Sequence, residues 1–107
     1  MKVSFIVPVF KPQPDIFKKC LKSLIDQSFK DWEAVIVFDG PDTGAEAVLS
    51  SFKDLRLKVV NMPHGGACAA RNEGFTHSKG EVLWHWDCDC LIEPDTCKAF
   101  VEELDKN

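Results

Sequence analysis

Two aspartates, Asp87 and Asp89, stand one residue apart directly after an apolar run of the sequence. In an extended chain, residues two apart lie on the same face, so both carboxylates would point the same way. Neighbouring carboxylates repel each other unless a cation lies between them, and Mg²⁺ or Mn²⁺ prefers such oxygen ligands and bridges them to substrate phosphates. Alternatively, the pair caps the helix that follows Pro94, although Asp95 already stands beside that helix. The spacing therefore favours a site for Mn²⁺ or Mg²⁺ over helix capping.

Two further segments carry polar groups next to glycines. Asp39 ends another apolar run beside Gly40, where an ordinary turn aspartate competes with a carboxylate that accepts hydrogen bonds from a base or a ribose. Residues 65–72 begin with two glycines and have small side chains, so a helix that starts there could bind an anion, with Arg71 reaching a phosphate or a base. A tightly packed helix with Arg71 as a surface cation explains the same pattern equally well. No Gly-x-Gly-x-x-Gly or Gly-Lys-Ser motif is present, which excludes a dinucleotide or P-loop site.

Short apolar runs alternate with helical periods along the whole chain. This alternation predicts βαβ units with right-handed crossovers, hence an α/β fold with a Rossmann-like parallel sheet of about four strands and flanking helices. In such sheets ligands bind beyond the carboxyl ends of the strands, and that edge would gather Asp39, Asp87 and Asp89. The expected strands are residues 3–9, 33–38, 56–61 and 81–86; the expected helices begin at Pro14, near Ala45 with Thr43 as its cap, at residues 65–67, and at Pro94 with Phe100, Val101 and Leu104 facing inward.

Composition excludes several classes of function. The chain has 107 residues, of which 45 % are hydrophobic and 28 % charged, as in a single globular domain. A formal net charge of −4 without a basic patch argues against nucleic acid and against a basic membrane-binding face. The longest apolar stretch, residues 3–10, is interrupted by Pro8 and is too short to span a bilayer; we expect no signal peptide and a cytoplasmic location.

The five cysteines, at positions 20, 68, 88, 90 and 97, suggest a reducing environment and small apolar packing roles. Their spacing with His85 matches no common structural zinc pattern. Cys88 and Cys90 are expected to alternate with the two aspartates and to point away from them. His64 and His77 are predicted to be solvated, and no Ser/His/Asp or Cys/His set indicates a nucleophile.

Taken together, these motifs resemble the inverting glycosyltransferases of GT-A fold, glycosyltransferase family 2. The resemblance covers residues 3–104 and rests on the order and spacing of several short matches: residues 3–10, 20–24 with Gln27-Ser28, Asp39-Gly40, Gly65-Gly66, Ala70-Arg71-Asn72 with Gly74, Gly80-Glu81 and Asp87-Cys88-Asp89. It implies a donor site in which each of the predicted residues has a role. Pro8, Val9 and Phe10 would line the base pocket, Asp39 would bind uracil, Arg71 would sit near the base and phosphates, Asp87 would approach the ribose and metal, and Asp89 would coordinate Mn²⁺ or Mg²⁺ on the diphosphate.

The chain departs from the family pattern at three positions. Phe38 stands where a second acid is usual, Pro41 replaces the usual serine, and Lys11 replaces a common asparagine. These departures could change which base the site prefers, so uridine is taken as the default of the family and not as a deduction from these residues. A nucleotidyltransferase on a related sheet would need a Gly-rich loop after the first strand, and residues 10–14 are not one.

Length sets the remaining expectations. The resemblance implies that residues 1–107 form the donor-binding half of a GT-A domain, truncated before the acceptor-binding half and the catalytic base. We therefore expect no catalytic residue in this range, little transferase activity by the chain alone, and membrane association, if any, through the missing C-terminal region. The exposed sheet edge is a candidate surface for a homodimer. The alternative is a non-catalytic nucleotide-binding or scaffold module that kept the fold.

Overall fold

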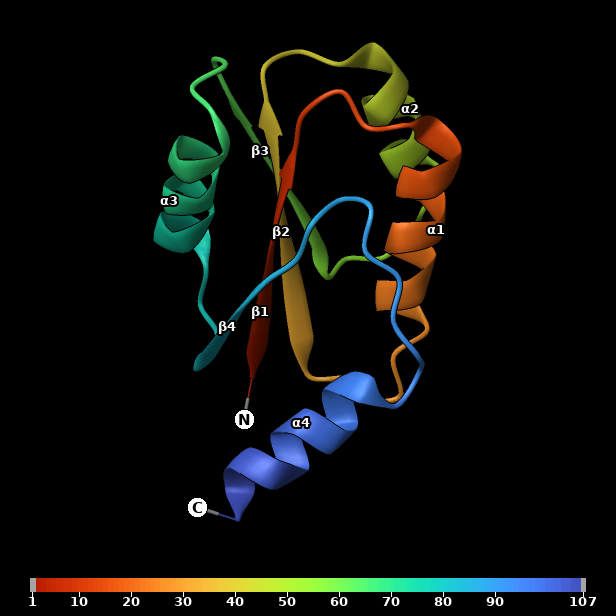
Figure 1. Ribbon diagram of the computed structural model, residues 1–107, viewed down its shortest axis with the longest axis vertical. Coiled ribbons are helices and arrows are strands. Elements are labelled where there is room, and N and C mark those ends of the chain that lie inside the picture. Colours follow the sequence, from red (N-terminus) through yellow and green to blue (C-terminus); the bar gives the residue numbers. More distant parts are fainter. Residues whose placement is uncertain (1, 107) are drawn as a thin grey trace.

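The computed structural model describes residues 2–106, which form one parallel β-sheet with helices on both faces (Figure 1). The four strands are ordered β3-β2-β1-β4. This confirms the predicted α/β fold with a parallel sheet of about four strands. In chain order the elements are β1 (Val3–Val9), α1 (Pro14–Ile25), β2 (Trp32–Asp39), α2 (Thr43–Ser50), β3 (Leu57–Met62), α3 (Ala67–His77), β4 (Val82–His85) and α4 (Thr96–Asp105).

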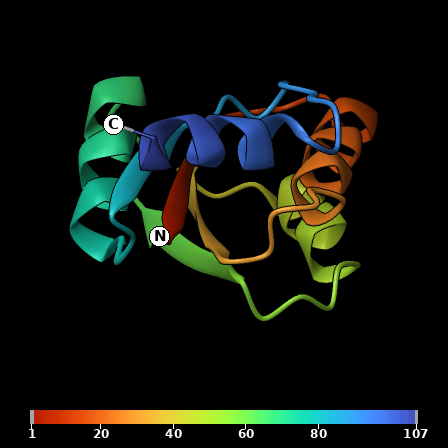
Figure 2. The same ribbon diagram turned by 90° about the horizontal axis from the view of Figure 1, so that it is seen from below.

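The two central strands, β1 and β2, are buried on both faces, which explains why their sequences are almost continuously apolar. They pair in parallel from Val3 with Trp32 to Val9 with Phe38. Alternate residues of each strand face opposite layers. Figures 1 and 2 show α3 on one side of the sheet and α1 and α2 on the other. The larger core lies on the α1 side, and a smaller cluster around Val35, Val37 and Ala70 lies under α3.

Helix α3 approaches the sheet unusually closely because its contact residues are small. A Cβ atom at Gly74 would lie 2.5 Å from Cγ2 of Ile6 and 3.3 Å from Cγ2 of Val37. Ala70, one turn earlier, is fully buried. Helix α3 therefore packs closely on the sheet at Ala70 and Gly74, and the approach at Gly74 depends on the absence of a side chain there.

Three local predictions differ from the structure. Asp42, not Thr43, caps α2, because its carboxylate accepts the Ala45 N–H at 3.0 Å. Helix α4 begins at Thr96, two residues after Pro94, and its first turn is capped by Gln27, whose Oε1 accepts the Cys97 N–H at 3.0 Å. Phe100 does not face fully inward: it is 44 % exposed, and its ring contacts that of the partly buried Trp84 at 4.9 Å between centroids. Within residues 2–106, no helix is both long and apolar enough to cross a membrane.

A buried carboxylate, Glu33, joins neighbouring segments near the amino-terminal ends of the strands. Glu33 is 1 % exposed and accepts hydrogen bonds from the Ser4 hydroxyl, the Lys79 N–H and the Lys58 ammonium, the last at 2.6 Å. Burial alone would raise the pKa of Glu33, but Lys58, Ser4 and the Lys79 N–H outweigh it and lower the pKa to about 2. Glu33 is thus an ionised group in β2 that links β1, β3 and the loop before β4.

We expect Gly74→Ala to lower the free energy of unfolding by about 1–3 kcal/mol, because the new methyl group overpacks against Ile6. Gly44→Ala is the matched control: its Cβ would meet only Asp42 Oδ1 at 3.5 Å, and a helical Gly→Ala change should be neutral or stabilise by up to about 1 kcal/mol. Urea denaturation of both variants measures the difference. Equal stability of the two would contradict the close packing of α3.

Glu33→Gln should destabilise the chain at pH 7 by on the order of 1–3 kcal/mol, since the amide loses the negative charge and keeps only one of the two oxygens that accept the three hydrogen bonds. Because the folded pKa of Glu33 is depressed, its contribution is present above pH 4.5 and is lost as the pH falls toward about 2. The stability difference between wild type and variant should therefore shrink over that interval. Glu102→Gln, an exposed change in α4, is the charge-matched control and should follow the wild-type pH profile.

Candidate donor-binding site

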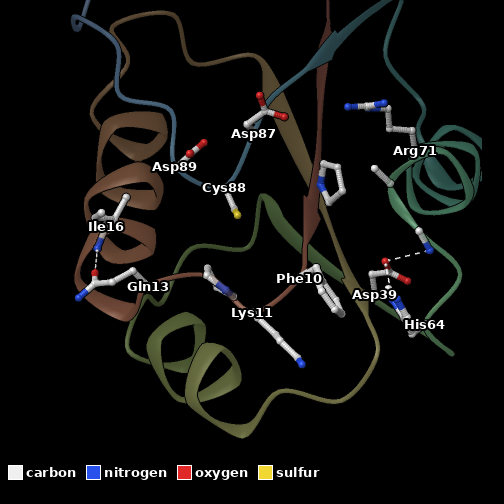
Figure 3. Close-up of a pocket in the computed structure, with 14 residues that line it drawn as sticks. Phe10, Lys11, Gln13, Ile16, Asp39, His64, Arg71, Asp87, Cys88 and Asp89 are labelled. Atoms are coloured by element: carbon white, nitrogen blue, oxygen red, sulfur yellow. Dashed lines mark hydrogen bonds and ion pairs between the residues drawn. The ribbon is translucent and has the colours of Figure 1, made fainter.

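A cavity of about 540 Å³ opens at the carboxyl edge of the sheet, where β1, β2 and β4 end (Figure 3). Most of its lining comes from the ends of strands and the loops that follow them, as expected for a parallel sheet, and helices α1 and α3 contribute Ile16, Ala67 and Arg71. Figure 3 shows Asp87 and Asp89 on one side and Asp39 with His64 on the other, with Cys88 and Phe10 between them. The lining residues are Pro8, Phe10, Lys11, Pro12, Gln13, Ile16, Asp39, His64, Gly66, Ala67, Arg71, Asp87, Cys88 and Asp89.

The Asp87–Asp89 segment is a turn rather than an extended strand. Strand β4 ends at His85, and the Cys90 N–H donates to the Asp87 carbonyl at 3.0 Å. The two aspartates line the same cavity because of this turn, not because of strand alternation. Cys88, predicted to point away from them, also lines the cavity. That prediction was wrong because alternation fails once the chain leaves the sheet.

The turn is fixed from beneath by Cys20 and Trp86. The Cys20 thiol donates to the Asp87 carbonyl at 3.5 Å and accepts the Trp86 indole N–H at 3.2 Å, while the Trp86 backbone N–H donates to Ile6 at 2.9 Å. Burial raises the pKa of Cys20 to about 12, so it remains a thiol and can donate. Sequence reasoning assigned Cys20 a packing role only. Its support of the aspartate turn had no signal in the sequence.

Asp39 holds the loop that precedes α3. Its side chain lies on the same face of β2 as those of Val35 and Val37, which is the face that α3 covers. Asp39 is 3 % exposed. Oδ1 accepts the Gly65 N–H at 2.7 Å, and Oδ2 accepts the Gly66 N–H at 3.2 Å and lies 3.0 Å from His64 Nδ1. Burial would raise the pKa of Asp39, but the Gly65 N–H, the His64 ring and the Gly66 N–H lower it overall. Asp39 is therefore an ionised acceptor, and more than a turn residue.

His64 is the functional candidate that sequence reasoning missed. It was expected to be simply solvated, yet its ring pairs with Asp39 and stacks on Phe10 at 4.3 Å between centroids and 17° between planes. The available signal was its position directly before the glycine pair. Lys11, next to Phe10, has a φ of 46°, a left-handed conformation that is uncommon for a residue with a side chain and often marks a functional loop.

Six of the seven residues predicted for the site line this cavity: Pro8, Phe10, Asp39, Arg71, Asp87 and Asp89. Val9 does not; it is 1 % exposed and packs in the core on the α1 side of the sheet. Arg71 extends from α3 toward the cavity (Figure 3) and has no hydrogen bond or ion pair within the described residues. Its guanidinium is therefore available for an anionic ligand.

The carboxylate oxygens at this cavity suit a hard divalent cation whose remaining ligands come from a bound phosphorylated molecule. Within residues 2–106, no three His, Cys, Asp or Glu side chains are grouped so that they could hold a metal ion. The carboxylates of Asp87 and Asp89 line one cavity, and Mg²⁺ commonly uses one or two carboxylates together with substrate phosphates. These residues therefore fit Mg²⁺ or Mn²⁺ in the presence of a phosphorylated ligand, and do not form a preassembled metal centre.

Comparison with known proteins defines the class. The family model described as Glycosyl transferase family 2 matches residues 4–107, and the chain belongs to this family. It is similar to the uncharacterized glycosyltransferase EpsJ of Bacillus subtilis (strain 168), with 33 % identity across 98 % of this chain and 31 % of EpsJ. The chondroitin synthase of Pasteurella multocida (strain Pm70) is 25 % identical over 98 % of this chain and 11 % of the synthase.

Two solved structures share the fold of this chain. TarS 1–349 of S. aureus superimposes with a TM-score of 0.88 at 28 % identity, over 99 % of this chain and 33 % of TarS 1–349. The mannosyltransferase PcManGT of Pyrobaculum calidifontis, in complex with GDP-Man and Mn²⁺, shares the fold with a TM-score of 0.84 at 24 % identity, over 95 % of this chain and 32 % of PcManGT. The GT-A fold is thereby confirmed, and the chain spans about a third or less of these four proteins.

Asp39→Asn should lower the free energy of unfolding by about 1–3 kcal/mol, because an amide group cannot accept from both glycine N–H groups and from His64. Asp87→Asn is the control for loss of one cavity carboxylate, since Asp87 makes no side-chain hydrogen bond in residues 2–106 and should tolerate the change. Thermal and urea denaturation compare the two. Equal losses would show that Asp39 does not hold the loop.

Proposed function

We propose that this chain binds a nucleoside diphosphate sugar, with a UDP-sugar as the default, in a metal-dependent manner, for transfer of the sugar to an acceptor. The observation that carries the proposal is the convergence of Asp39, Arg71, Asp87 and Asp89 on one cavity. The Mn²⁺ and GDP-Man held by PcManGT support it at the level of the fold. From its family we further propose that the transferred sugar is a hexose, which would make the whole enzyme a hexosyltransferase.

Each residue then has a role that its chemistry supports. Asp39 accepts from the base and Phe10 stacks on it, while Arg71 offers a cation near the base and phosphates. Asp87 and Asp89 would hold Mn²⁺ or Mg²⁺ against the diphosphate, with Asp87 also near the ribose. The bound metal would neutralise charge that develops on the departing nucleoside diphosphate.

We further propose that the acceptor site and the carboxylate base belong to the part of the family domain that this chain does not span. The chain alone should then bind the donor and transfer little sugar.

The outer edge of β4 has no partner strand within the described residues, so a second copy could pair there as a homodimer. All five cysteines are unpaired, which supports a reducing, cytoplasmic setting.

Titration calorimetry with UDP tests the proposal. In Mn²⁺, the wild-type chain should bind UDP, and chelation of the metal or Asp89→Ala should weaken binding at least about tenfold because the diphosphate loses its cation. Asp105→Asn, an exposed change at the end of α4, is the charge control and should bind as the wild type does. Absence of binding by any nucleoside diphosphate would overturn the proposal and favour a scaffold module that kept the fold.

A further inference from the structure

The stacked rings of Phe10 and His64 separate two cavities. Beside the donor cavity lies a second one of about 270 Å³, lined by Phe10, Lys11, Asp39, Gly40, Pro41, Asp42 and His64. Four residues line both spaces: Phe10, Lys11, Asp39 and His64. The two spaces therefore adjoin one another, and the stacked rings of Phe10 and His64 are part of the boundary that they share.

The imidazole of His64 makes the two contacts that the proposed function gives to a base. It is a flat ring stacked on Phe10 at 4.3 Å, and it lies 3.0 Å from Asp39 Oδ2 through a ring nitrogen. Because the ionised Asp39 is acceptor-only, Nδ1 must carry the proton and donate it. A pyrimidine with an imide N–H presents the same combination, an aromatic face and one N–H donor, to the same two partners.

Asp39 has little capacity left for a second ring. Oδ2 already accepts from both His64 and the Gly66 N–H, which uses its two lone pairs, and Oδ1 accepts from Gly65. His64 itself is weakly held: its side chain is 57 % exposed, and Asp39 is its one polar partner among residues 2–106. Displacement of the ring therefore costs one hydrogen bond and one stacking contact, and the base replaces both.

We propose that His64 is an internal occupant of the base subsite, which competes with the nucleobase and turns away from Phe10 when a pyrimidine nucleotide binds. The inference rests on the proposed function, since it needs the base to bind at Phe10 and Asp39. It is the opposite of a supporting role for His64: an occupant weakens binding, whereas a positioning residue strengthens it. The sign of one affinity change separates the two.

Calorimetry with UDP and Mn²⁺ should show tighter binding by His64→Ala than by wild type, about three- to tenfold, because one charge-assisted hydrogen bond and one stacking contact no longer oppose the base. Uridine without metal should gain by the same factor, and pyrophosphate with Mn²⁺ should not. His77→Ala removes another exposed histidine, paired with Glu73 on α3, and should leave all three affinities unchanged. Unchanged or weaker UDP binding by a stably folded His64→Ala chain overturns the inference.

A second measurement uses the wild-type chain and does not depend on the variant. In NMR spectra, the His64 ring protons should be shifted upfield by Phe10 in the free chain and should move toward exposed-histidine values at saturating uridine. Ring protons that keep their shift at saturation overturn the inference while leaving the proposed function intact. Failure of the wild type and His64→Ala alike to bind UDP or uridine overturns the proposed function itself, and this inference with it.

Discussion

The hydrogen bonds between the Asp39 carboxylate and two consecutive backbone N–H groups, of Gly65 and Gly66, are the constraint on which the site depends. They join the end of β2 to the loop after β3, across the edge where the cavity opens. Gly66 has a φ of 96°, which a residue with a side chain rarely adopts, so the glycine allows the turn and the carboxylate holds it. The start of α3, and with it Arg71, is placed by this contact.

The opposite wall of the cavity is fixed by a different device. After the aspartate turn, the chain runs back along the molecule to α4 (Figure 1). The buried amide of Gln27 holds it there, because Nε2 donates to the Glu93 carbonyl at 2.9 Å and Oε1 accepts from the Cys97 N–H. Ser28 donates to Asp95 at 2.6 Å on the same stretch. With Cys20 beneath Asp87, the segment is therefore held at both ends by α1 and the turn that follows it. The carboxylates that suit a cation therefore lie on a loop that is anchored by hydrogen bonds at both ends.

Features that depend only on neighbouring residues in the sequence could be predicted from it. Apolar runs and helical periods gave the α/β order, and the rule that ligands bind beyond the strand ends placed Asp39, Asp87 and Asp89 at one cavity. Contacts between distant segments were not readable. The stack of His64 on Phe10, the support of Asp87 by Cys20 and the role of Gln27 each join residues more than fifty positions apart. Alternation failed at Cys88 for a local reason, because the strand had already ended at His85.

Strand β2 carries a buried carboxylate near each end, Glu33 at its start and Asp39 at its finish. At roughly 3.3 Å per residue the two lie about 20 Å apart, well beyond the roughly 7–10 Å within which changes at two sites usually couple. Each is neutralised by its own neighbours, Lys58 and the Lys79 N–H at one end and the glycine N–H groups at the other. The effects of charge substitutions at the amino ends of the strands on stability should therefore add independently to those at the carboxyl ends. The amino ends can thus be changed to raise thermal stability without altering how the cavity at the carboxyl ends binds anions.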